Sequence, residues 1–210
     1  MADILPAFPL SLVAFPGEEL NLHIFEPRYK QLMHECEKNG ITFTVVPYFE
    51  GKKAEYAAEM KLLEISKIYP DGKMDIKTKG IGLCRIIDFF DRHPNKLYPG
   101  IEMERLRWDD TADIVLTLDI LDQVAVLYET MSVDNVKIQS PGEFRTYQIA
   151  HKVGFNVDQE LEFLTLQSER DRQIYMIDHL KKIIPVVEEM EVLKQRAAMN
   201  GHFKNVIPNK

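Results

Sequence analysis

The spacing of apolar residues changes near Trp108, and this change constrains the fold more than any other feature of the sequence. Before it, apolar and polar residues alternate, as in residues 20–24, which is the period of a half-buried strand. After it, apolar residues recur every three or four positions, as on one face of a helix. The sequence therefore predicts an α+β protein, in which a β-rich part, residues 1–110, is followed by a helical part, residues 111–210, that packs against it.

Turn residues divide the β-rich part into short strands. The strongest turn signal is Pro-Asp-Gly at 70–72, which predicts a hairpin. In the second arm of this hairpin Met74, Ile76 and Thr78 share one face. The runs that predict strands are 20–25, 41–46, 61–69, 73–79, 83–90 and 98–106. Short strands with this turn punctuation indicate a strongly bent sheet or small barrel.

One helix is expected inside the β-rich part. Pro27 suits a first helical position, and Asn39-Gly40 provides a stop. The apolar stripe between them consists of Tyr29, Leu32, Met33 and Cys36.

The helical part contains four expected helices. A short one starts with a capping box at Ser140 and ends near Gly154, the next is capped by Asn156, and a long one opens at Ser168. Pro185 is expected to kink or divide the long helix, because proline removes a backbone hydrogen bond, and Asn200-Gly201 to end it. The stripes of the first and last helices are Leu118, Leu121, Ala125 and Tyr128, and Ile174, Ile177, Leu180, Ile184 and Val187.

Composition limits the classes of protein that fit. The chain is 45% hydrophobic, which is enough for a sizeable core, and no apolar run approaches the length of a membrane span. The first residues lack the basic start and apolar stretch of a secretory signal. Cys36 and Cys84 are interpreted as reduced core thiols. These features predict a cytoplasmic protein.

Sequence signatures of catalysis are absent. The pairs Gly51-Lys52 and Gly72-Lys73 lack the rest of a phosphate-binding loop. Gly80-Ile81-Gly82 resembles a dinucleotide fingerprint, but Arg85 stands where the third glycine belongs. His34 and Cys36 lie two apart on an expected helix and so point away from one another. We therefore predict no enzyme activity, cofactor or metal.

Two neighbouring motifs carry a resemblance to a known family. Phe15-Pro16-Gly17 is followed by Leu-His-Ile-Phe-Glu-Pro-Arg-Tyr at 22–29. This arrangement resembles the N-terminal domain of Lon-type ATP-dependent proteases, especially its stand-alone relatives. The resemblance extends over nearly the whole chain and implies a PUA-like barrel followed by a helical subdomain ending in a long helix.

In Lon proteases this domain helps to recognise unfolded or degron-bearing proteins. The resemblance therefore implies a non-catalytic module or adaptor that binds unfolded or partly folded protein segments, or a protease or chaperone. The candidate peptide-binding residues adjoin the turn: His23, Phe25, Arg28 and Tyr29. The alternative is that Phe25 and Tyr29 are core residues while Glu26 and Arg28 fix the helix start. Structural roles are expected for Phe15, Pro16, Gly17, Glu26 and Pro27.

Two other function classes stay open. Some PUA-like folds bind RNA, and the hairpin between Lys67 and Arg85 carries an excess of basic residues. The net charge of −7 argues against nucleic acid, because counterion release from phosphates favours basic proteins. A hydrolase or transferase with an unrecognised site has no motif to support it.

Overall fold

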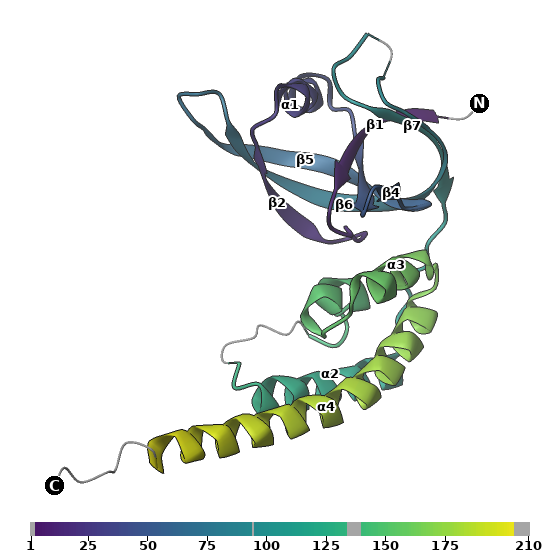
Figure 1. Cartoon of the computed structure of the whole chain (residues 1–210). Helices are drawn as coiled ribbons and strands as arrows, with labels where there is room; N and C mark the ends of the chain where they lie inside the picture. Colours follow the sequence, from purple (N-terminus) through teal and green to yellow (C-terminus); the bar gives the residue numbers. More distant parts are fainter. Residues whose placement is uncertain (1–2, 94, 134–139, 204–210) are drawn as a thin grey trace, which may run out of the picture.

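The computed structural model describes residues 3–93, 95–133 and 140–203 (Figure 1). The β-rich part forms a seven-stranded sheet with one inserted helix. Its elements are β1 (Asp3–Leu10), β2 (Glu19–Ile24), α1 (Pro27–Asn39), β3 (Phe43–Phe49), β4 (Lys52–Lys53), β5 (Tyr56–Ile68), β6 (Met74–Phe90) and β7 (Gly100–Leu106).

The strands form a ring. The antiparallel pairings run from β1 to β7, β6, β5 and β3, and β3 then pairs in parallel with β1, with Ala7 opposite Thr44. Outside the ring, β2 pairs with β6, and β4 pairs with β3. This arrangement confirms the predicted bent sheet or small barrel. The predicted stripe of α1 is confirmed too, because its four residues are buried against the barrel.

The hairpin at residues 70–72 is confirmed, but its second arm is longer than predicted. β6 continues without a break from Met74 to Phe90, so the two expected strands 73–79 and 83–90 are one. The sequence suggested a division because glycine weakens a strand. Gly80 instead marks a close approach, because a β-carbon there would lie 2.2 Å from the carbonyl oxygen of Phe15.

The segment that approaches Gly80 is the predicted Phe15-Pro16-Gly17 turn. The amide of Glu18 donates to the carbonyl of Phe15 at 3.2 Å, and Gly17 has a φ of 81°, which glycine adopts without strain. Gly17 donates to the carbonyl of Gly80 at 2.9 Å, and Gly80 donates to that of Glu18 at 2.8 Å. The turn is therefore fixed to the middle of β6.

The helical part consists of α2 (Ile114–Thr130), the 3₁₀ helix η1 (Thr146–Lys152), α3 (Val157–Thr165) and α4 (Glu169–Phe203). Asn156 caps α3 as predicted. The expected helix at Ser140 is wrong: Ser140 does donate to the Glu143 carboxylate at 2.8 Å, but only a turn follows, and η1 begins at Thr146.

The predicted stripe of α2 is one position out of place. Of its members only Tyr128 is buried, and Leu118 is exposed. The buried face includes Thr117, whose hydroxyl accepts a 2.8 Å hydrogen bond from Gln173 on α4. The buried face consists of Thr117, Ile120, Val124, Leu127 and Tyr128, so the prediction chose the neighbouring stripe. Thr117 is buried in this face because its hydroxyl is hydrogen-bonded. On α4 the polar Gln173 is buried for the same reason, whereas the predicted Ile174 is exposed.

Pro185 does not divide α4. The helix continues through it, and through the predicted stop at Asn200-Gly201, to Phe203. Figure 1 shows the helix curving along its course rather than breaking. The tail beyond it lies outside the described residues.

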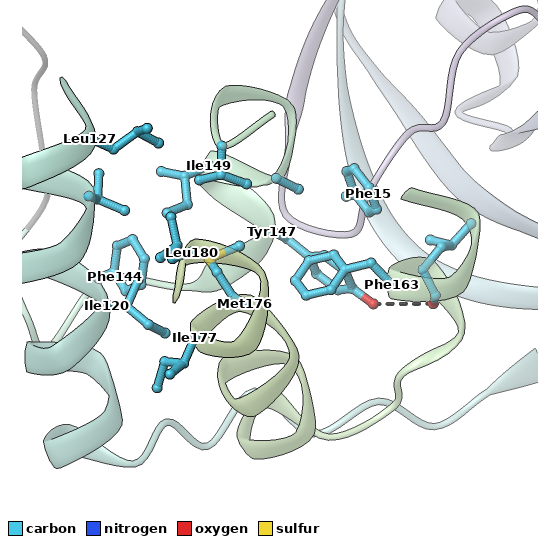
Figure 2. Packing of buried hydrophobic residues seen from close by; sticks show 14 of the residues in the cluster. Phe15, Ile120, Leu127, Phe144, Tyr147, Ile149, Phe163, Met176, Ile177 and Leu180 are labelled. Atoms are coloured by element: carbon cyan, nitrogen blue, oxygen red, sulfur yellow. Dashed lines mark hydrogen bonds between the residues drawn. The ribbon is translucent and has the colours of Figure 1, made fainter. Parts of the chain in front are cut away.

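The two parts of the chain share one core. Phe15 is fully buried and projects from the barrel between helical aromatic rings, with its ring centroid 5.1 Å from that of Tyr147 and 5.9 Å from that of Phe163 (Figure 2). Val13 and Leu83 of the β-rich part join the same cluster. Aromatic packing of this kind stabilises the junction by burial and by ring geometry.

In the part of the chain that the structure describes, no helix is long and apolar enough to cross a membrane. Cys36 and Cys84 are both buried, and neither forms a disulfide.

Candidate functional site

A groove lies where the barrel meets the helices, between β4 and α3. Its volume is about 510 Å³. We call it the β4–α3 groove. Ten residues from the β1–β2 loop, β3, β4 and α3 line it: Ser11, Pro47, Phe49, Glu50, Lys52, Lys53, Ala54, Val157, Asp158 and Leu161.

The groove combines apolar and charged residues. Phe49 and Leu161 are partly buried and pack against the core shared by the two parts. The charged lining residues are Glu50, Lys52, Lys53 and Asp158. An apolar floor beside charged groups suits an apolar peptide segment whose backbone and ends stay hydrated. β4 consists of two residues, Lys52 and Lys53, which pair with β3 at one rim of the groove.

Two of the four sequence candidates, His23 and Phe25, meet elsewhere, at the end of the β5–β6 hairpin. The ring of Phe25 is 58% exposed and lies 6.4 Å from that of His23. His23 and Tyr69 both bond to the carboxylate of Asp75, at 2.6 and 2.7 Å. We call His23, Phe25 and Tyr69 the tip patch. The β5–β6 hairpin projects from the barrel (Figure 1), and His23 lies beside it because β2 pairs with β6 at Asp75.

The other two candidates serve the helix start. Tyr29 is 3% exposed and stacks on Phe8 with 4.0 Å between centroids, so its ring is a core ring and does not reach the surface. Burial raises its pKa to about 12. Arg28 bonds to Glu26 at 2.9 Å and lies over the Tyr29 ring. The contacts of Arg28 are therefore with the start of α1.

Acidic side chains pair with part of the basic charge on the hairpin. Lys73 pairs with Asp71 at 2.8 Å, Lys77 with Glu64 at 2.6 Å and Arg85 with Glu104 at 2.7 Å. Lys67 lies over the ring of Tyr69. Three of the five basic side chains between Lys67 and Arg85 thus have a carboxylate partner, which reduces the positive charge that is available to a phosphate backbone.

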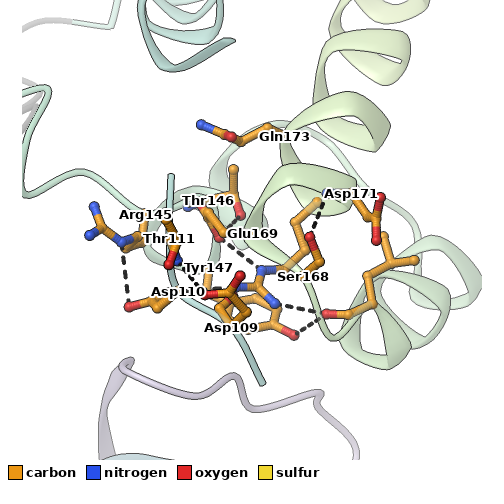
Figure 3. Close-up of polar contacts among 12 residues, drawn as sticks. Asp109, Asp110, Thr111, Arg145, Thr146, Tyr147, Ser168, Glu169, Asp171 and Gln173 are labelled. Atoms are coloured by element: carbon orange, nitrogen blue, oxygen red, sulfur yellow. Dashed lines mark hydrogen bonds and ion pairs between the residues drawn. The ribbon is translucent and has the colours of Figure 1, made fainter. Parts of the chain in front are cut away.

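A buried ion pair holds the connection between the two parts. Arg172 and Glu169 are both fully buried on α4, and the guanidinium Nε lies 2.8 Å from the carboxylate. Arg172 also donates to the carbonyls of Leu166 at 2.8 Å and Asp109 at 2.9 Å. The Glu169 carboxylate has a second partner in Thr146, whose backbone amide and hydroxyl donate hydrogen bonds to it at 2.8 and 3.0 Å (Figure 3). The network fixes the linker and η1 to the start of α4.

His151 forms a second connection, between the Phe15 turn and α3. Its Nε2 lies 3.3 Å from Glu18 and its Nδ1 2.7 Å from Glu160. Burial lowers the pKa of His151, but hydrogen bonds and attraction to the two carboxylates outweigh burial and raise the pKa to about 9. The imidazolium form therefore bridges the barrel to the helix that lines the groove.

This bridge predicts a stability that falls in alkaline solution. Because the folded pKa of His151 lies above the unfolded value of about 6.5, its contribution is complete below pH 6.5 and is lost as pH rises through about 9. We expect His151→Gln to cost about 1–2 kcal/mol near pH 6, allowing for solvent screening of this partly exposed ring, and little above pH 9.5. Denaturant unfolding of both proteins across this pH range measures the difference. An equal cost at both pH values would contradict the bridge.

Both cysteines are buried thiols. Burial raises the pKa of the Cys36 and Cys84 thiols to about 12, which keeps both protonated. Within residues 3–93, 95–133 and 140–203, no three His, Cys, Asp or Glu side chains are placed to hold a metal ion.

Sequence reasoning did not find the β4–α3 groove. Its apolar residues come from segments more than 100 positions apart, such as Phe49 and Leu161, and no local pattern links them. The only sequence signal was the general expectation that the helices pack against the sheet.

Comparison with known proteins gives the fold but no sequence family. No protein-family model matches the chain, and no curated protein sequence does so. A crystal structure of a Lon N-terminal domain protein from Xanthomonas campestris aligns with a TM-score of 0.64 and 22% identity, over 84% of this chain and 98% of that one. The N-terminal domain of Lon protease from Mycobacterium avium complex aligns with a TM-score of 0.63 and 12% identity, over 85% and 98%. The resemblance seen in the sequence is confirmed at the level of the fold.

Proposed function

We propose that this chain, which has the fold of the Lon N-terminal domain, is a non-catalytic module that binds unfolded protein segments in the β4–α3 groove. The observation that carries the proposal is the groove itself, where an apolar floor and charged side chains meet at the junction of barrel and helices. One of the similar structures is a domain of Lon protease, and a protease acts on proteins. The analogy of fold therefore supports the proposal that the ligand is a protein.

The position of the groove suits a binding role. Apolar segments of unfolded proteins gain affinity mainly by burying side chains, so a partly buried floor such as Phe49 and Leu161 supplies the driving force. Lys52, Lys53 and Asp158 provide both signs of charge. A groove of this composition accepts many sequences, because none of its groups demands a single polar partner.

Val157→Lys tests the groove directly. Val157 is exposed at the first position of α3, so a lysine there is tolerated by the fold but introduces charge into the groove. We expect binding of a fluorescent, permanently unfolded protein to weaken about fivefold or more, as measured by fluorescence anisotropy.

The matched control is Val115→Lys. Val115 is also an exposed valine in the first turn of a helix, α2, and it does not line the groove. Its affinity for the same probe should equal that of the unsubstituted protein. If both lysine variants bind equally well, the groove is not the site.

The surface proposed from the sequence, at His23, Phe25, Arg28 and Tyr29, overlaps the tip patch at His23 and Phe25. One further variant decides between that surface and the groove. Phe25→Ser removes the exposed ring of the patch and leaves the groove unchanged. A loss of probe binding in this variant alone would move the site to His23, Phe25 and the neighbouring Arg28. Affinity that falls steeply with salt, for RNA in place of the protein probe, would favour the nucleic-acid alternative.

A further inference from the structure

The second half of α4 carries an apolar stripe that nothing in the described structure covers. Residues along α4 recur with alternating spacings of three and four: Met176, His179, Ile183, Val186, Met190, Leu193 and Ala197. This is the heptad spacing of a helix that packs lengthwise against another helix. We call these seven positions the α4 seam.

The seam passes from buried to exposed. Met176 and His179 are buried beneath the rest of the helical part, and Ile183 is half-buried. Beyond them Met190 is 62% exposed and Leu193 55% exposed. Figure 1 shows this end of α4, in yellow, extending past the other helices. Single exposed apolar residues are ordinary on a protein surface, but a continuous heptad stripe is typical of an interface.

We propose that the exposed half of the α4 seam pairs with the same segment of a second copy of this chain, in antiparallel orientation. The two-fold axis would pass between Glu191 and Val192. Met190 would then face Leu193 of the other copy, and Val186 would face Ala197. The stripe is complementary to itself in this register.

Charges beside the seam select this register. In each heptad of the seam, one flanking residue stands directly before the first core residue, as Glu189 stands before Met190. In antiparallel pairs, flanking residues of this kind from the two helices lie opposite one another across the interface. In the proposed register these are Glu189 of one copy and Arg196 of the other, so two attractive pairs form. If the register moved by one heptad toward the body, Glu189 of one copy would lie opposite Glu189 of the other. If it moved by one heptad the other way, Arg196 of one copy would lie opposite Arg196 of the other. Both shifts bring like charges together.

The location of the folded body selects the orientation. The body covers the seam side of α4 as far as Ile183, so two parallel helices would bring both bodies into the same space. In the antiparallel arrangement the two bodies lie at opposite ends of the paired segment. The paired segment runs from Val186 to Ala197, which at about 1.5 Å per residue is about 16 Å long. Because so short a segment buries a small interface, we expect a reversible, concentration-dependent dimer.

Two valines of similar exposure provide the first test. Val186 on the seam is 50% exposed, and Val192, on a different face of the same helix, is 46% exposed. Sedimentation velocity of the full chain over a concentration series should show a dimer. Val186→Lys should weaken it about tenfold or more, while Val192→Lys should leave the dissociation constant unchanged. A full chain that stays monomeric at every concentration, or equal effects of the two variants, would overturn the proposal.

Crosslinking tests the orientation. A V186C/A197C variant should form a covalent dimer on oxidation, because those positions face one another. V186C alone should not, because antiparallel pairing separates the two copies of this position by 11 residues, or about 16 Å. The native cysteines are buried and do not compete. Efficient crosslinking of V186C alone would show a parallel pair and overturn the antiparallel assignment.

Charge reversal tests the register. Glu189→Arg and Arg196→Glu should each weaken the dimer, since each places like charges across the interface. The double variant should recover most of the affinity. Failure of the double variant to recover would reject the proposed register.

Discussion

Replacement of Gly80 by alanine is expected to destabilise the fold by about 3 kcal/mol or more, and it leaves little folded protein if the native stability is ordinary. A β-carbon at this position would lie 2.2 Å from the carbonyl oxygen of Phe15 and 3.1 Å from the Cα of Pro16. These are backbone atoms, so no side-chain rotation relieves the contact. The turn must move away from β6, and the two hydrogen bonds between Gly80 and the turn are lost with it.

The effect of Gly80→Ala reaches the helical part through Phe15. Displacing the turn withdraws the Phe15 ring from its packing against Tyr147 and Phe163. Denaturant unfolding measures the loss, and tryptophan fluorescence reports the helical junction because the only tryptophan, Trp108, packs near Tyr147.

Gly82→Ala is the matched control for this substitution. Gly82 lies two residues further along the same strand, and a β-carbon there meets only the Glu59 side chain, at 3.7 Å. We expect a change within about 1 kcal/mol in either direction, because alanine also restricts the unfolded chain. Equal stability of the two variants would show that the turn does not depend on close approach at Gly80.

Removal of the Arg172 side chain is the second large expected effect. Arg172→Met should cost about 3–5 kcal/mol, because it leaves the buried Glu169 carboxylate without its cation. It also removes the donors to the carbonyls of Leu166 and Asp109. Arg170→Met provides the comparison, since Arg170 is exposed on the same helix and its pair with Asp113 contributes about 1 kcal/mol or less.

Lowering the pH should restore part of the stability that the Arg172→Met variant has lost. Burial already raises the pKa of Glu169, and loss of the guanidinium raises it further. Because the folded pKa then lies well above the unfolded value of about 4.3, the penalty is complete at neutral pH and disappears as pH falls below that value. The double variant E169Q/R172M should be more stable than R172M at pH 7. A deficit that does not change with pH would mean that the cost arises from lost packing and carbonyl donors, rather than from the charge.

The sequence predicted most of the architecture, and the parts that failed share a physical cause. Local signals worked where one residue type determines geometry: Gly17 in the turn, Pro27 at the start of α1 and Asn156 at the start of α3. They failed where a contact distant in sequence decided the outcome. The strands expected at 73–79 and 83–90 proved to be one, and the turn that packs on Gly80 between them is more than 60 residues away.

The candidate site was predicted less well than the fold. The residues of the Leu-His-Ile-Phe-Glu-Pro-Arg-Tyr motif proved to have divided roles, with Tyr29 in the core and Phe25 at the surface. A motif records which residues recur together and does not show which of them face solvent. The charged core pair of Arg172 and Glu169 was also missed, since charged residues on a helix are ordinarily assigned to its exposed face.

Ring closure has a consequence for the order in which the chain can fold during synthesis. β1 completes the ring through pairs with β7, in which Asp3 lies opposite Met103, so the first strand made must wait for almost 100 further residues. At roughly 5–20 residues per second, translation leaves β1 without that partner for about 5–20 s, and for longer until β7 leaves the ribosome. During that time its edge is exposed to wrong pairing. β1 can pair with β3 much earlier, so the contact that closes the ring last is the one between β1 and β7.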